Sequence, residues 1–136
     1  MSFDIAVLSL EKKVTNAEAT DIYAELNEGN YSRIAPNDAI NRIYHELTAK
    51  HPEIDDVPDD KIDDLDFCPW SCDIDKSDGH LIISSVWPKS DYAHKLVQEI
   101  ATKHQLPTFD PQNGVITYPD GSSGIESEKK KWWQFW

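Results

Sequence analysis

Two nearly uninterrupted apolar runs constrain this chain most, because each has the length of a strand and neither has a wholly polar face. They are Phe3–Leu10, interrupted by Asp4 and Ser9, and Leu81–Trp87. Alternate side chains of a strand point to opposite faces, so both runs place apolar groups on both sides of a sheet. We therefore expect two central strands. In the first run the two faces are Phe3, Ile5 and Val7, and Ala6, Leu8 and Leu10.

Three further segments repeat apolar residues at the 3.6-residue period of a helix packed on one side. The first, 15–28, opens with Thr15 and Glu18 at the spacing of a capping box. The second begins near residue 36 and ends at 51, before a proline, and the third covers about 90–106. The expected inward residues are Ala19, Ile22, Tyr23 and Leu26, then Ile40, Ile43, Tyr44 and Leu47, then Ala93, Leu96, Val97, Ile100 and Ala101.

Turn residues indicate two hairpins. Asp75–Gly79 lies between a short strand near Trp70 and the second apolar run, and Asp110–Gly114 separates short strands at 106–109 and 115–118. The resulting order is strand, helix, helix, strand, strand, helix, strand, strand. This order predicts an α+β fold in two layers, with a mostly antiparallel sheet and the helices packed on one face.

The length of 136 residues suits one domain, and 39% hydrophobic residues are enough for a core. We assign residues 1–119 to a single α+β domain and 120–136 to a flexible linker with a basic, tryptophan-rich tail. Four aromatic residues of the tail are candidate anchors for a partner or for a homodimer: Trp132, Trp133, Phe135 and Trp136. No apolar run reaches the ~20 residues of a membrane span, and the start lacks a secretory signal, so we expect a cytoplasmic protein.

The segment between His51 and His80 is strongly acidic. Eleven carboxylates face two lysines there, a net charge of -9 within the total of -12. Such density of like charge predicts an exposed loop over 53–66, argues against a nucleic-acid partner and favours a basic protein. The expected contact residues are six steering charges and two aromatic anchors that could equally be core residues: Asp55, Asp56, Asp59, Asp60, Asp63, Asp64, Trp70 and Trp87.

The sequence contains no complete metal motif. Asp73-x-Asp75-x-Ser77 begins like a calcium loop, but the position of the turn glycine holds Asp78 and that of the bidentate glutamate holds Ser84. A structural zinc site needs four ligands, and the chain has only two cysteines. We therefore expect no metal and no cofactor.

Catalytic motifs are also missing, since neither a phosphate loop nor a nucleophile elbow is present. We expect a non-enzymatic protein in which Cys68 and Cys72 are buried free thiols. One alternative is a small thiol-dependent hydrolase or transferase that uses either cysteine with His80 as the base. Another is an adaptor module that dimerises through its tail.

Four short patterns together resemble a family of small uncharacterised bacterial proteins. They are Phe3-Asp4-Ile5-Ala6-Val7, Pro69-Trp70-Ser71, Ser85-Val86-Trp87 and Asp110-Pro111-Gln112, and the resemblance covers about residues 3–119. Proteins of this kind are similar in size and acidity to immunity proteins of bacterial polymorphic toxin or secretion systems. The resemblance implies a cytoplasmic protein that binds a basic toxin, such as a nuclease, and occludes its active site. It supplies no catalytic residues.

Overall fold

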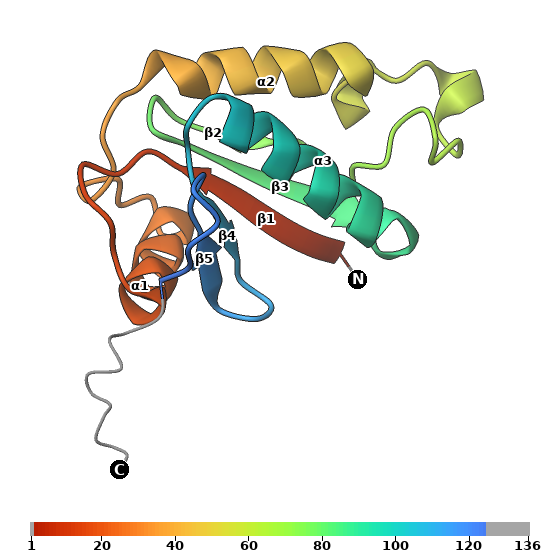
Figure 1. Cartoon of the computed structure of the whole chain (residues 1–136). Coiled ribbons are helices and arrows are strands. Elements are labelled where there is room, and N and C mark those ends of the chain that lie inside the picture. The colour runs from red at the N-terminus through yellow and green to blue at the C-terminus, as the bar shows by residue number, and fades with distance from the viewer. Residues whose placement is uncertain (1, 125–136) are drawn as a thin grey trace.

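The computed structural model describes residues 2–124, which form a five-stranded antiparallel sheet with three α-helices (Figure 1). The strands are β1 (Ser2–Leu8), β2 (Asp75–Lys76), β3 (His80–Val86), β4 (Thr108–Asp110) and β5 (Val115–Thr117). The helices are α1 (Asn16–Asn27), α2 (Asp38–Lys50) and α3 (Ser90–Lys103). The strand order is β2-β3-β1-β4-β5, with every neighbouring pair antiparallel. The predicted α+β class is confirmed.

The two apolar runs form the centre of the sheet. All seven residues of β1 pair with β3. Ile5 and Val7 belong to one core cluster, whereas Ala6 and Leu8 belong to the cluster on the other face. The alternation predicted for the first run is confirmed.

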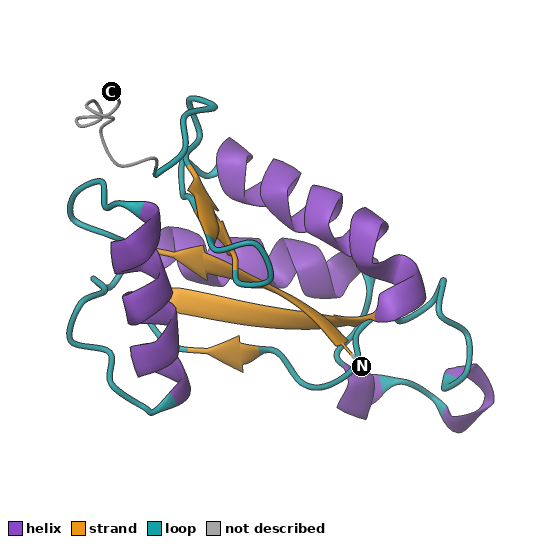
Figure 2. Cartoon of the chain, turned by 90° about the horizontal axis from the view of Figure 1, so that it is seen from below, coloured by secondary structure: helices purple, strands orange, loops and turns teal. Residues whose placement is uncertain are grey.

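The helices cover both faces of this sheet, which differs from the expected two layers. The stripes of α2 and α3 pack on the face that contains Ile5, and α1 packs on the opposite face with Ile82, Phe109 and Ile116. In Figure 2 α2 passes behind the strands, while α1 stands on the near side. The physical reason lies in the central strands: an apolar strand with side chains on both faces needs cover on both.

The helix starts follow the capping chemistry of the sequence. Thr15 Oγ1 accepts a hydrogen bond from the Glu18 N–H at 3.1 Å, and the Glu18 carboxylate accepts one from the Thr15 N–H at 2.9 Å. The predicted capping box is therefore present. Helix α2 begins slightly later than expected, because Asn37 is its N-cap and accepts from the Ala39 N–H at 2.8 Å.

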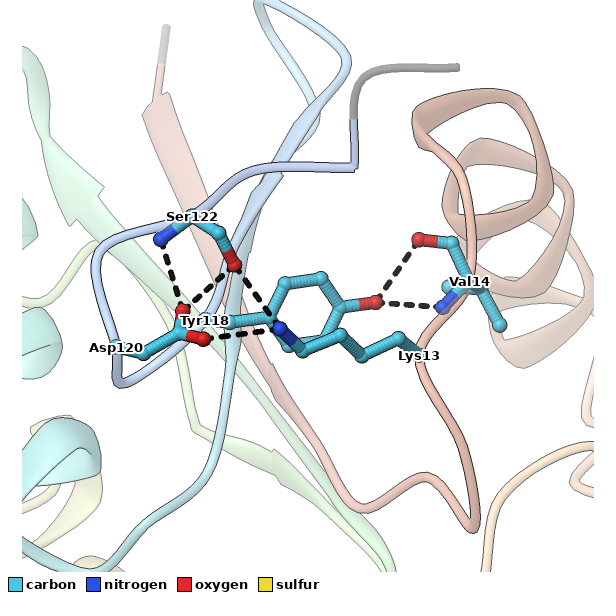
Figure 3. Close-up of polar contacts among 5 residues, drawn as sticks. All are labelled: Lys13, Val14, Tyr118, Asp120 and Ser122. Atoms are coloured by element: carbon cyan, nitrogen blue, oxygen red, sulfur yellow. Dashed lines mark hydrogen bonds and ion pairs between the residues drawn. The ribbon is translucent and has the colours of Figure 1, made fainter. Parts of the chain in front are cut away.

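A clasp of polar contacts holds the segment after β5 to the loop between β1 and α1 (Figure 3). The Tyr118 hydroxyl accepts from the Val14 N–H at 2.6 Å and donates to the Val14 carbonyl at 2.9 Å. Lys13 Nζ lies 2.9 Å from the Asp120 carboxylate and 3.1 Å from the Ser122 hydroxyl. Hydrogen bonds from Ser122, and then the Lys13 ammonium, hold the pKa of Asp120 below its ordinary value.

The ordered domain extends beyond the boundary at 119 that composition suggests. The Gly124 N–H donates to the Ile116 carbonyl at 3.0 Å, and the Gly124 carbonyl accepts from the Asn16 N–H at 2.5 Å. Residues 120–124 thus pack on the domain, although their composition is typical of a linker. The predicted tail anchors lie outside the described residues: Trp132, Trp133, Phe135 and Trp136.

Candidate functional site

The acidic loop, residues 53–66, follows the C-terminal end of α2 and projects from the body at the right of Figure 1. It contains two single turns of 3-10 helix, Ile54–Asp56 and Asp59–Lys61. Val57 is its one buried residue, so the loop is exposed as predicted, with more local structure than an open chain. All six predicted steering charges are exposed: Asp55, Asp56, Asp59, Asp60, Asp63 and Asp64.

Both ends of the acidic loop are anchored to the domain. The Glu53 carboxylate accepts from the Ile74 N–H at 2.9 Å and from the Tyr44 hydroxyl at 2.7 Å. The second bond raises the pKa of Tyr44 to about 12, which keeps its hydroxyl protonated as the donor. At the other end Lys89 pairs with Asp66 and lowers the pKa of that carboxyl. These contacts therefore fix both ends of the loop that carries the exposed aspartates.

A buried polar cluster lies beneath the loop. His51 Nδ1 is 3.0 Å from the Phe67 carbonyl oxygen, and Nε2 is 2.7 Å from the Tyr92 hydroxyl. Since a carbonyl only accepts, Nδ1 carries the proton of the neutral ring and Nε2 accepts from Tyr92. The Trp70 indole N–H donates to the His51 carbonyl at 3.1 Å, and Trp70 is only 1% exposed. Trp70 is thus a core residue that supports the loop, and not an accessible anchor.

Three of the four large hydrophobic side chains exposed among residues 3–124 lie in or beside the acidic loop. Ile62 belongs to the loop and is 49% exposed, Trp87 is 51% exposed, and Tyr92 is 45% exposed. Tyr92 lines one cavity with Leu65, Asp66 and Lys89, and Trp87 precedes Lys89 by two residues in the chain. Lys89 pairs with Asp66 of the loop. We call these three residues with the six aspartates the acidic–aromatic surface.

The two aromatic members of this surface are held by contacts of their own. The Trp87 ring packs against Phe3, with ring centroids 5.9 Å apart, and Tyr92 is hydrogen-bonded to His51. Tyr92 was not expected from sequence reasoning. The sequence does contain a signal for Tyr92, because this residue lies on α3 outside the apolar stripe. An aromatic side chain on the polar side of a helix does not pack in the core and stays exposed.

The cysteines differ from each other in their surroundings. Cys68 is buried, and desolvation by burial raises its pKa, whereas Cys72 is exposed. The expectation of two buried thiols is thus wrong for Cys72. A hydrogen bond that protonated Asp73 donates to Asp55, with partial desolvation and the neighbouring carboxylates, raises the pKa of the Asp73 carboxyl at the base of the loop. Among residues 2–124, no three His, Cys, Asp or Glu side chains are grouped to hold a metal ion.

His80, the base in the thiol alternative, contacts other partners. It is fully buried, with Nδ1 2.5 Å from Ser77 Oγ and Nε2 3.2 Å from the Asp75 carboxylate. Both ring nitrogens are therefore engaged by residues of the β2–β3 hairpin, and neither by a cysteine. Sequence reasoning considered Ser77 only as part of a calcium-like pattern and missed its pairing with His80. The spacing of Asp75, Ser77 and His80 across a predicted turn was the signal that could have grouped them.

Comparison of the chain with protein-family models, with curated proteins and with solved structures finds no match. The resemblance to small bacterial proteins similar to immunity proteins stays a prediction. Within the described part of the chain, no helix has both the length and the apolar character needed to cross a membrane. What the structure provides is an α+β domain with an anchored, acidic and partly aromatic surface at one end.

Proposed function

We propose that the acidic–aromatic surface binds a basic protein, and that the chain acts as an immunity protein that neutralises a basic toxin by occluding its active site. The observation that supports this proposal is the coincidence of two features on one surface. Six exposed aspartates and the exposed Ile62 lie in the loop, and the exposed Tyr92 lines one cavity with Leu65 and Asp66 of the loop. Either feature alone is common on soluble proteins.

The two features would have different roles in binding. Clustered carboxylates raise the association rate with a basic partner by about 10- to 1000-fold at low salt. Exposed aromatic residues supply the apolar contact that slows dissociation, since Trp and Tyr are enriched among the residues that dominate binding energy. Trp87 and Tyr92 are the side chains suited to the second role.

The anchoring of the loop favours binding as well. A free acidic chain would lose conformational entropy when it docks, at a cost of about 0.5–1.5 kcal/mol for each side chain that becomes fixed. Here Glu53 and Lys89 already fix the two ends of the loop. A projecting loop of this kind can enter a cationic cleft, such as the substrate site of a nuclease, and present carboxylates in place of phosphates.

The test uses matched charge variants as bait in pull-downs from the lysate of the source cell. The loop variant changes four exposed aspartates that make no side-chain hydrogen bond to another described residue: Asp56, Asp59, Asp60 and Asp63 to Asn. The control removes the same number of charges from exposed carboxylates on other elements: Glu11, Asp21, Glu28 and Glu99 to the corresponding amides. Both variants therefore have the same net charge.

A basic protein retained by the parent chain and by the control, but lost with the loop variant, would support the proposal. Its association rate should fall about 10-fold or more with the loop variant at low salt, and this difference should shrink at high salt. Trp87→Ser should raise the dissociation rate and leave the association rate nearly unchanged. Equal losses with the loop variant and the control would show that total charge, and not this surface, governs capture. Inhibition of the partner's toxic activity tests the immunity role itself.

A further inference from the structure

Three chemistry-bearing side chains meet in the β2–β3 hairpin, which begins directly after Ile74, the residue that bonds Glu53 of the acidic loop. Ser77 Oγ lies 2.5 Å from His80 Nδ1, and His80 Nε2 lies 3.2 Å from the Asp75 carboxylate. We propose that this hairpin is a second functional site, a serine acyl-hydrolase centre in which Ser77 is the nucleophile, His80 the general base and Asp75 a positioning residue. This inference goes beyond the proposed binding function and does not depend on it.

The protonation state needed for this role follows from the partners of His80. A carboxylate only accepts hydrogen bonds, so Asp75 fixes the proton of the neutral ring on Nε2. Nδ1 is then free to accept the hydroxyl proton of Ser77. A nucleophile bonded to a base, with the base oriented by a third group, is the relationship that activates serine in proteins. Burial of His80 keeps water away from the proton path.

Substrate access is provided by a cavity of about 540 Å³ between the hairpin and the N-terminal end of α2. Ser77, Lys76 and Asp78 line it from the hairpin, and Asp38 and Asn41 line it from α2. The Asp78 N–H follows the nucleophile directly and makes no hydrogen bond to another described residue. A backbone N–H at that position is a donor suited to an oxyanion.

The reaction is the hydrolysis of a carboxylic ester. Ser77 Oγ forms a bond to the acyl carbon while its proton passes to His80 Nδ1, and the imidazolium is held by Asp75. The carbonyl electrons move to the oxygen, then return as the bond to the leaving alcohol breaks, and that alcohol takes the proton from His80. Water then attacks the acyl-Ser77 ester with the same base, which releases the carboxylic acid and restores the hydroxyl.

The charges around the cavity indicate the class of ester. Two carboxylates that line it, Asp38 and Asp78, together with Asp75 beside His80, outnumber the single Lys76. An anionic ester would be repelled, so the substrate class is a neutral or cationic ester.

The experiment treats the full chain with a neutral fluorophosphonate, which phosphonylates an activated serine with loss of fluoride, and maps the modified residue by mass spectrometry. Turnover of p-nitrophenyl butyrate is measured in parallel. We expect modification at Ser77 in the folded chain and none after unfolding in urea. Ser77→Ala should abolish both signals. Ser32→Ala, at an exposed serine of the neighbouring loop, should change neither.

Variants of Asp75 separate catalysis from hairpin structure. Asp75→Asn should slow modification of Ser77 by about 100-fold, the lower end of what general-base assistance contributes, and Asp75→Glu should recover part of the rate. Circular dichroism of every variant verifies the fold. Absence of label on Ser77 in the folded parent chain would overturn the proposal, and so would equal labelling of folded and unfolded chains. In either case the three residues serve only to hold the turn.

Discussion

The same substitution at two tryptophans should change the stability of the domain by very different amounts, although sequence reasoning treats the two residues alike. Trp70→Phe removes an indole that is 1% exposed and donates to the His51 carbonyl. Trp87→Phe changes a side chain that is 51% exposed. The first should destabilise the domain, whereas the second should leave its stability nearly unchanged.

The expected loss at Trp70 has two parts. Replacing an indole by a phenyl ring leaves a void of roughly 40 Å³, which at about 24 cal/mol per Å³ costs about 1 kcal/mol. The His51 carbonyl loses its donor, and an unpaired buried acceptor costs about 1–3 kcal/mol. The total is about 2–4 kcal/mol, against no more than about 0.5 kcal/mol at the half-exposed Trp87.

Urea unfolding followed by circular dichroism measures this difference. With a slope of about 2 kcal/mol per M, Trp70→Phe should lower the midpoint by about 1–2 M at an unchanged slope. Trp87→Phe should shift it by about 0.25 M or less. A midpoint for Trp70→Phe that matches the parent chain would refute the reasoning, because it would mean that the indole is neither buried nor bonded in solution.

Tyr118→Phe removes the hydroxyl that is hydrogen-bonded to the Val14 backbone and should lower the free energy of unfolding by about 1–3 kcal/mol in the same assay. Asp120→Asn removes an exposed ion pair with Lys13 and should lower it less. A larger loss for Asp120→Asn would contradict the role of the Tyr118 hydrogen bonds. Because the pKa of Asp120 is lowered, its contribution is present above the unfolded value of 3.8 and is lost at lower pH, so the midpoints of the parent and Asp120→Asn should converge as the pH falls from about 5 to about 2. The raised pKa of Asp73 has the opposite sign: its ionised form is disfavoured in the folded chain, so Asp73→Asn should stabilise the domain at neutral pH and lose that effect at low pH, where Asp73 itself is protonated. Stabilisation that persists at low pH would exclude charge repulsion as its cause. Iodoacetamide should modify Cys72 in the native protein and Cys68 only after unfolding, and equal rates measured by mass spectrometry would contradict the burial of Cys68.

The parts of the fold that the sequence predicts are those set by local periodicity. The stripe of α3, from Ala93 to Ala101, is buried as expected, and the alternation in β1 divides Ile5 and Ala6 between the two faces. Periodicity shows which side of a helix is apolar. It does not show which face of the sheet receives the helix, which is why the position of α1 could not be predicted.

The sequence predicts where the charged residues of the candidate sites are exposed. It does not predict which side chains contact each other in these sites. Exposure of the aspartates follows from their density, because so many like charges cannot be buried together. The difference between Trp70 and Trp87 depends instead on which residues the fold places around each indole. The contact of Ser77 with His80 depends on the register of a hairpin, which a turn motif alone does not fix.

Both edges of the described sheet are short, because the edge strands are β2, with two residues, and β5, with three. At one edge, β3 is flanked by the two residues of β2 and by a bridge between Trp70 and Ser85, and at the other, β5 is bridged at Thr117 to Ser123. Such short edges offer few free backbone groups to another chain. Among the described residues, the backbone is therefore a poor template for strand addition or for edge-to-edge aggregation. A partner of the described domain is therefore expected to recognise it mainly by its side chains.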